Sequence, residues 1–204
     1  MNLPEARQQR LFALVEEHFS KHPTDPHHSI DHISRVVSWV MLLSEKEKAD
    51  ASITIPAAIL HDIAIPEYGN EAHARKGAEM CRPFLKRCGY SESEIFRISK
   101  AILMHSADDS KSPESIEAKV LFDADKLDAV GPSSLNRWLF EYQKKGCSNE
   151  NMPRKALKHL ERWKLRYGNP PFFTPTAKSI GKKRYVWLIG VLKDIEKDFR
   201  KTKI

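Results

Sequence analysis

The chain is poor in residues on which several large enzyme classes depend. It has only 8 glycines among 204 residues, and neither a Walker-type glycine loop nor a Gly-x-Ser-x-Gly elbow occurs in it. Its three cysteines, Cys81, Cys88 and Cys147, form no Cys-x-x-Cys pair, which indicates a reduced chain with inert thiols. A phosphate group would have to be held by a metal ion and side chains, because no glycine-rich loop is there to hold it.

Long hydrophobic runs are also absent. The longest apolar stretches are far short of the roughly 20 residues that span a bilayer, and residues 1–7 lack signal-peptide architecture. A composition of 41% hydrophobic and 30% charged residues is that of an ordinary soluble globular protein. We therefore expect a cytoplasmic protein with no membrane partner. The net charge of +7 would concentrate anions such as nucleotides, although a solvated helix face explains most of the basic residues in 178–203.

No stretch shows the period of two that marks β-strands, whereas apolar spacings of three and four recur along the chain. Stripes of this kind begin at Leu11, Ile30, Ile95 and Val186. The helical stripes are separated by breaks at residues 22–26, 66–69, 110–113, 146–153 and 167–171. These patterns predict an all-α bundle of about seven or eight helices.

At 204 residues the chain can bury roughly 70% of its unfolded surface in one core. Ser91 followed by Glu94 predicts a capping box at the start of a helix. The segment after about residue 140 could complete the same bundle or pack as a small cap. We favour one domain over residues 1–204.

The most informative pair is His61-Asp62, which follows the apolar run of residues 55–60. Successive residues both reach one metal ion only where a helix is ending, and the nearby Pro66 favours such an end. His32 and Asp125 are further candidate ligands in hydrophobic helical contexts. Nitrogen and oxygen donors without a thiolate suit a catalytic divalent cation such as Mn, Fe, Co, Ni or Zn. A core histidine would explain His32 alone, and Asp62 could instead cap the next segment.

The residues around these donors resemble the HD-domain metal-dependent phosphohydrolases from about residue 29 to about residue 137. The matching segments are residues 32–36, 58–63, 102–106 and 123–131. Within that superfamily the chain is most similar to small single-domain hydrolases, which carry a segment like Phe-Phe-Thr-Pro-Thr-Ala at 172–177. The resemblance implies an HD-type helical bundle with its metal-site core over about 29–137. The C-terminal helices in 138–204 would complete or cap that core.

The resemblance also implies one divalent transition-metal ion, with Mn or Fe preferred, held by His32, His61, Asp62 and Asp125. Asp125 is chosen because the family's final ligand is the aspartate before a Lys-Leu pair. Asp62 is expected to act in catalysis as well as in metal binding. An ion held in this way keeps one or two positions open for water and a phosphate oxygen.

Some HD enzymes hold a second ion on extra histidines between the His-Asp pair and the final aspartate, and His73 and His105 occupy comparable places. The binuclear members generally supply a neighbouring second histidine where this chain has Ser106, so one ion is expected. His105 is assigned to phosphate binding or proton transfer, and His73 is a further candidate for the site. The other histidines are expected at the surface or in turns: His18, His22, His27, His28 and His159.

Two more aspartates share the helix of Asp125, and buried carboxylates there would need cations or a metal ion nearby. Asp123 is expected to start the helix or to orient a ligand histidine. Asp128 is expected to contact substrate or to pair with a lysine. Lys126, the residue after Asp125, diverges from it by about 100° on a helix and need not face the site.

Two arginines are candidates to neutralise charge that develops on phosphoryl oxygens in the transition state. Arg35 lies one helical turn after His32. Arg137 matches a basic position that follows the final aspartate segment in the similar hydrolases. Either residue could instead form a structural ion pair.

These features predict metal-dependent hydrolysis of a nucleotide or another small phosphate ester by metal-activated water, as a phosphomonoesterase or a nucleotide pyrophosphatase. The alternative is a non-catalytic HD-like module that binds a ligand or a protein, although degenerate members of that kind usually lose the His-Asp pair. Binding of nucleic acid has only the basic charge in its favour, without a clear glycine turn between two short helices. We expect a small phosphorylated substrate and no specific nucleic-acid partner, and the sequence indicates no oligomeric state.

Overall fold

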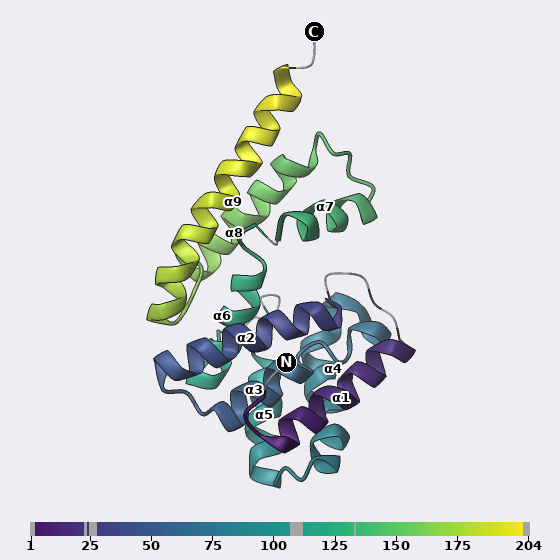
Figure 1. Cartoon of the computed structure of the whole chain (residues 1–204). Helices are drawn as coiled ribbons and strands as arrows, with labels where there is room; N and C mark the ends of the chain where they lie inside the picture. The colour runs from purple at the N-terminus through teal and green to yellow at the C-terminus, as the bar shows by residue number, and fades with distance from the viewer. Residues whose placement is uncertain (1–2, 23, 25–27, 107–111, 133, 202–204) are drawn as a thin grey trace. The chain divides into compact units, whose positions relative to one another are not determined.

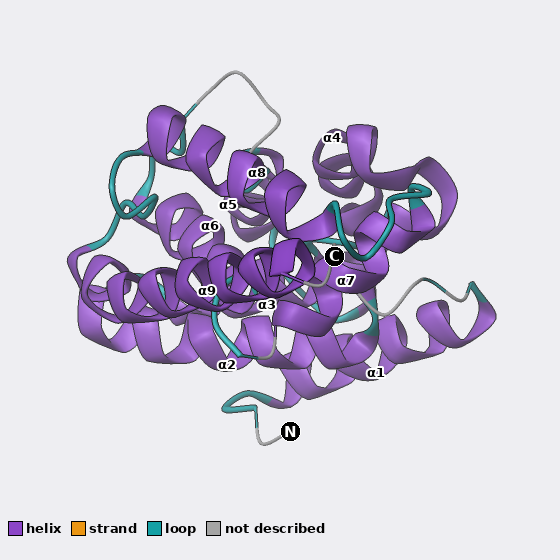
Figure 2. Cartoon of the chain, turned by 90° about the horizontal axis from the view of Figure 1, so that it is seen from above, coloured by secondary structure: helices purple, strands orange, loops and turns teal. Residues whose placement is uncertain are grey.

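The computed structural model describes residues 3–22, 24, 28–106, 112–132 and 134–201, which form helices and no strand (Figure 2). The helices of these residues are α1 (Ala6–Lys21), α2 (Ile30–Glu47), α3 (Ala51–Leu60), α4 (Ile65–Arg87), α5 (Glu92–Leu103), α6 (Ile116–Asp128), α7 (Ser134–Lys144), α8 (Met152–Tyr167) and α9 (Pro175–Lys201). The predicted all-α class is confirmed, with slightly more helices than expected. None of the helices described has both the length and the apolar character needed to cross a membrane.

Contacts divide the chain into two compact units. The N-terminal unit is Met1–Asp125 and the C-terminal unit is Lys126–Ile204. In Figure 1 the first contains α1 to α5 and most of α6, and the second contains α7 to α9. The single domain expected from the sequence stays a prediction.

Helix α3 forms the centre of the N-terminal unit because it is apolar on every side. All of its residues from Ile53 to Leu60 are buried, and α1, α2 and α5 contact it. Asp50 caps its start by accepting a hydrogen bond of 3.0 Å from the backbone N–H of Ser52. The helix ends at the buried Leu60, inside this unit. The next two residues, His61 and Asp62, are therefore also in the interior, with exposed fractions of 1% and 3%.

The structure contains the predicted capping box, at the start of α5, and one of the predicted breaks, inside α4. The capping box forms at α5, where the backbone N–H of Glu94 donates to Ser91 Oγ and the backbone N–H of Ser91 donates to Glu94 Oε2. The expected break at 66–69 is a kink inside α4, where Gly69 has a φ of 66°. Glycine adopts that left-handed backbone without the steric cost that a Cβ would bring.

In the C-terminal unit, α8 and α9 lie side by side (Figure 1). Thr174 precedes α9 and accepts a hydrogen bond of 3.3 Å from the backbone N–H of Ala177, while Pro175 occupies the first turn. Phe172 is buried, and its ring lies directly against the backbone of Gly181. The Phe-Phe-Thr-Pro-Thr-Ala segment therefore both starts α9 and fixes its packing.

Gly181→Ala should destabilise the protein because a Cβ at this position would lie 2.1 Å from Phe172 Cε2. Overpacking of this kind lowers the free energy of unfolding by about 1–3 kcal/mol. Gly190→Ala is the matched control in the same helix, since nothing lies within 4 Å of its Cβ, and the better helix propensity of alanine should add up to about 1 kcal/mol. Urea unfolding of both variants measures the difference. Equal midpoints for the two variants would refute the packing assigned to Phe172.

The end of α6 is tied to the rest of the C-terminal unit through its backbone carbonyls. Trp138 Nε1 donates to Ala129 O, and Arg184 Nε donates to Val130 O, each at 3.0 Å. Gly131 follows with a φ of 103°, and a Cβ there would lie 2.7 Å from the guanidinium of Arg184. This position therefore needs glycine for its backbone conformation and for the close approach of the arginine.

Candidate metal centre

The four predicted metal ligands come together in the N-terminal unit. His32 Nε2 lies 3.3 Å from His61 Nε2 and 3.6 Å from Asp62 Oδ2. The same nitrogen lies 3.5 Å from Asp125 Oδ1, and His61 Nε2 lies 3.4 Å from Asp62 Oδ2. Two atoms bound at about 2.1 Å to one ion are at most about 4.2 Å apart. Each of these distances is therefore short enough for both atoms to bind the same ion.

The ring of His61 is oriented by its own helix. Its Nδ1 lies 2.7 Å from Ala58 O, and a carbonyl oxygen only accepts hydrogen bonds, so Nδ1 carries the proton. When the ring carries no second proton, its Nε2 presents a lone pair toward His32. Ligand histidines in metal sites commonly donate their second nitrogen to a carbonyl in this way.

Asp62 gives the clearest indication that a cation belongs in the site. Its Oδ2 is buried and has no hydrogen-bond partner among the described residues, a costly arrangement for a carboxylate. Burial acts to raise the pKa of Asp62, but the charges of His61, His28 and His32 outweigh it and hold that pKa well below its usual range. A divalent ion among these donors would compensate the buried charge, so the residues fit the metal that was predicted.

The competing explanation of Asp62 as a helix cap is wrong. The residue that precedes α4 is Ala64, and no side chain makes a capping hydrogen bond there. The backbone carbonyl of Asp62, and not its carboxylate, accepts a hydrogen bond of 2.9 Å from the backbone N–H of Ile65. The carboxylate is thereby left to face the histidines.

His73 and His105 form a second pair of histidines beside Asp62, and His73 lies toward its other carboxylate oxygen, Oδ1. His73 Nε2 is 3.2 Å from His105 Nε2 and 3.9 Å from Asp62 Oδ1. Burial first, and then the charges of His73 and His61, lower the pKa of His105 to about 3, so its ring is neutral at physiological pH. Asp62 therefore belongs to two groups, one with His32 and His61 and one with His73 and His105, and the ligand atoms of each group lie within 4.8 Å of one another.

His28 was placed at the surface or in a turn by the sequence, but it belongs beside the site. It is only 9% exposed, and its ring centroid lies 6.3 Å from that of His32. The signal that could have found it is its spacing of four residues from His32, which puts the two on one side of a helical segment. His22 is exposed as expected, and His27 lies outside the described residues.

The structure also shows the surroundings of Asp123, Asp128 and Lys126, which share α6 with Asp125. Asp123 is fully buried in the middle of the helix, so it does not start it. Asp128 is 2% exposed, and its Oδ2 lies 3.8 Å from Arg137 Nη1, so its ion-pair partner here is an arginine. Lys126 Nζ lies 5.4 Å from the ring centroid of Trp163, a cation–π distance. Lys126 is thus directed toward an aromatic ring of the C-terminal unit.

The two candidate catalytic arginines differ in their surroundings. Arg35 is exposed on α2, three residues after the buried His32. Arg137 belongs to the C-terminal unit and has a side chain that is 22% exposed. A part for either in catalysis stays a prediction.

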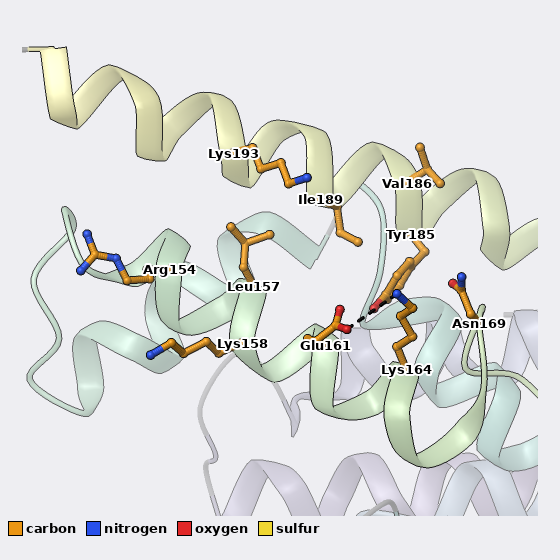
Figure 3. A pocket seen from close by; sticks show the side chains of 10 residues that line it. All are labelled: Arg154, Leu157, Lys158, Glu161, Lys164, Asn169, Tyr185, Val186, Ile189 and Lys193. Atoms are coloured by element: carbon orange, nitrogen blue, oxygen red, sulfur yellow. Dashed lines mark ion pairs between the residues drawn. The ribbon is translucent and has the colours of Figure 1, made fainter.

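A groove of about 520 Å³ lies between α8 and α9 (Figure 3). It is lined by Arg154, Leu157, Lys158, Glu161, Lys164, Asn169, Tyr185, Val186, Ile189 and Lys193. Its charge is mainly positive, and Lys164 lies 3.6 Å from the one carboxylate, that of Glu161. Because this lining has no histidine, it lacks the imidazole donors that mark the centre around Asp62.

Comparisons with known proteins agree with this centre. The model of the HD domain family matches residues 29–130, half of the chain. The YpgQ protein of Bacillus subtilis is 29% identical over 175 residues, which cover 84% of each sequence. A crystal structure of a predicted HD superfamily hydrolase from an uncultured Thermotogales bacterium has 29% identity and a TM-score of 0.65, with 94% of this chain and 92% of that chain covered.

A crystal structure of Bacillus subtilis YpgQ in complex with ADP has 24% identity and a TM-score of 0.71 to this chain, and 94% of each chain is covered. This likeness shows that the two chains share a fold over nearly their whole length. The family match over residues 29–130 includes His32, His61, Asp62 and Asp125 of the centre described above. The chain therefore belongs to the HD-domain family of hydrolases.

Proposed function

We propose that the protein is a metal-dependent phosphohydrolase that cleaves a nucleotide or another small phosphate ester. The observation that supports this most strongly is the convergence of His32, His61, Asp62 and Asp125, with Asp62 Oδ2 buried and without a hydrogen-bond partner. Imidazole and carboxylate donors without a thiolate suit Mn, Fe, Co, Ni or Zn, and we prefer Mn or Fe. The HD-domain family itself implies a divalent ion.

When bound, this ion supplies an activated water and a Lewis acid for a phosphate oxygen. Asp62 and His61 hold their donors at the end of α3, so their positions are fixed by the packed core before substrate arrives. His105 is proposed to take part in phosphate binding or proton transfer: its Nδ1 donates to Ile102 O at 2.5 Å, which directs its Nε2 toward His73. Arg35 and Arg137 are proposed to neutralise charge on the phosphoryl oxygens.

A nucleotide is the substrate class we favour. The ADP complex of YpgQ, a protein of the same fold, supports this choice. The net charge of +7 also favours the approach of polyanionic nucleotides. The three cysteines are free and buried, which suits a reducing compartment, and we propose that the enzyme works in the cytoplasm on small phosphorylated molecules.

A substrate screen tests the proposed function. Nucleoside diphosphates and triphosphates, cyclic nucleotides and phosphomonoesters are each incubated with the protein and Mn, Fe, Co, Ni or Mg. We expect release of phosphate or pyrophosphate from nucleotides, with Mn or Fe more effective than Mg because imidazole donors bind transition metals better. Asp62→Ala serves as the inactive control. A protein that binds Mn and ADP but cleaves none of these compounds would instead be a ligand-binding module.

A further inference from the structure

The groove between α8 and α9 leaves apolar side chains uncovered on the C-terminal unit. Leu157 of α8 and Ile189 of α9 project into the space between the two helices (Figure 3), and each is half-buried. Val186 in the lining is 62% exposed, and Leu165, one helical turn after the lining residue Glu161, is 78% exposed. An apolar strip with a polar rim is typical of a surface that another molecule covers.

The rim of this groove carries more positive than negative charge. Its charged lining residues are the cations Arg154, Lys158, Lys164 and Lys193 and the carboxylate of Glu161. Arg154 and Lys164 are each paired with a glutamate, at 3.4 and 3.6 Å. Lys158 on α8 and Lys193 on α9 have no ion-pair partner among the described residues. An occupant that complements this rim therefore carries negative charge.

The length of the groove suits a helix as its occupant. The lining residues on α8 run from Arg154 to Lys164, which is about 15 Å of helix at 1.5 Å per residue. An amphipathic helix of about three turns covers this length when it lays its apolar stripe along the floor. Its flanking side chains then lie beside the unpaired lysines on both sides of the groove.

Other polyanions fit the groove less well. A single nucleic-acid strand gains affinity from bases stacked on aromatic rings, but the aromatic ring of this lining is that of Tyr185, which is 3% exposed and whose hydroxyl donates to Leu160 O. A free nucleotide needs polar groups that converge on it, whereas Figure 3 shows Lys158, Lys164 and Lys193 spread along the groove. Cations spread in this way match carboxylates spaced along a helix.

We propose that the groove between α8 and α9 docks an acidic amphipathic helix of a partner protein, with its apolar stripe on Leu157 and Ile189 and its carboxylates beside Lys158 and Lys193. Burial of the apolar surfaces supplies affinity, and the lysines select the sign of the partner's charge. The groove lies in the C-terminal unit and contains none of the proposed metal ligands. Docking is therefore independent of the proposed hydrolysis.

Fluorescence anisotropy with a synthetic peptide tests this docking. The probe is a labelled helix of about four turns, with leucines at spacings of three and four and glutamates elsewhere. The full chain should bind it, and Lys158→Glu/Lys193→Glu should weaken binding by at least about tenfold because like charges then face each other. Lys155→Glu/Lys183→Glu is the matched control, since it makes the same charge change at exposed positions of α8 and α9 outside the lining, and it should bind as wild type does.

A charge swap gives a result that loss of folding cannot imitate. A peptide with lysine in place of each glutamate should bind Lys158→Glu/Lys193→Glu more tightly than it binds wild type. Failure of wild type to bind the acidic peptide, or equal binding by the two double variants, would overturn the docking site. A single-stranded oligonucleotide that binds wild type more tightly than the acidic peptide does, and that is lost in Lys158→Glu/Lys193→Glu, would overturn it in favour of nucleic acid.

Discussion

Asp125→Ala is expected to abolish turnover together with metal affinity. Asp125 Oδ1 lies 3.5 Å from His32 Nε2, and its side chain is 11% exposed, so water replaces the lost oxygen poorly. Losing one of four donors should lower kcat/KM by at least about a thousandfold, equivalent to about 4 kcal/mol of transition-state stabilisation. Bound Mn and the initial rate on the best nucleotide are measured on the same preparation.

Asp31→Ala is the control for this variant. Asp31 is an exposed carboxylate in the first turn of α2, directly before His32, so its removal changes the charge near the site without removing a donor. It should retain both metal and activity. If Asp125→Ala kept the Mn content and the rate of wild type, Asp125 would not be a ligand.

Arg35→Ala and Arg137→Ala are expected to separate catalysis from metal binding. Neither residue is among the proposed donors, so both variants should bind Mn as wild type does. If their guanidinium groups stabilise transition-state charge, kcat/KM should fall by roughly ten- to a thousandfold, or about 1.4 to 4 kcal/mol. Arg75→Ala, at an exposed position of α4, controls for the loss of one positive charge.

Arg137 needs a stability measurement beside the kinetics. Its guanidinium lies 3.8 Å from the carboxylate of Asp128, which is 2% exposed, and removing it leaves a buried charge without this partner. Arg137→Ala should therefore also lower the melting temperature, whereas the exposed Arg35 should not affect it strongly. If both variants kept the kcat/KM of wild type, the two arginines would have structural roles and no part in catalysis.

The ligand group of His32, His61 and Asp62 could be predicted because the sequence around each residue indicates its burial and where its helix ends. The apolar run before His61-Asp62 predicts a buried helix, and the nearby Pro66 predicts the turn that lets both side chains face the same point. The structure has both, with α3 ending at Leu60. His32 was found because it lies in the apolar stripe of α2, where a polar ring needs a partner inside the core.

The second group could not be predicted from local patterns. His73 and His105 lie 32 residues apart in the sequence, and their meeting depends on how α4 bends at Gly69 and packs against α5. His28 was missed because the prolines and histidines around it in the sequence are typical of an exposed turn, whereas His28 itself is buried beside His32. Long-range packing brings His73 and His105 together, and no spacing of three or four residues records it, whereas the spacing of four between His28 and His32 was a signal in the sequence.

The metal dependence of nucleotide cleavage tests the central claim most directly. Release of phosphate and pyrophosphate from nucleoside diphosphates and triphosphates is followed for wild-type protein as prepared, after stripping with a chelator, and after Mn is restored. The metal-dependent phosphohydrolase proposed here should lose its activity on stripping and recover it with Mn, while Asp62→Ala stays inactive throughout. An unchanged rate after all metal has been removed, or a rate in Asp62→Ala equal to that of wild type, would contradict the account.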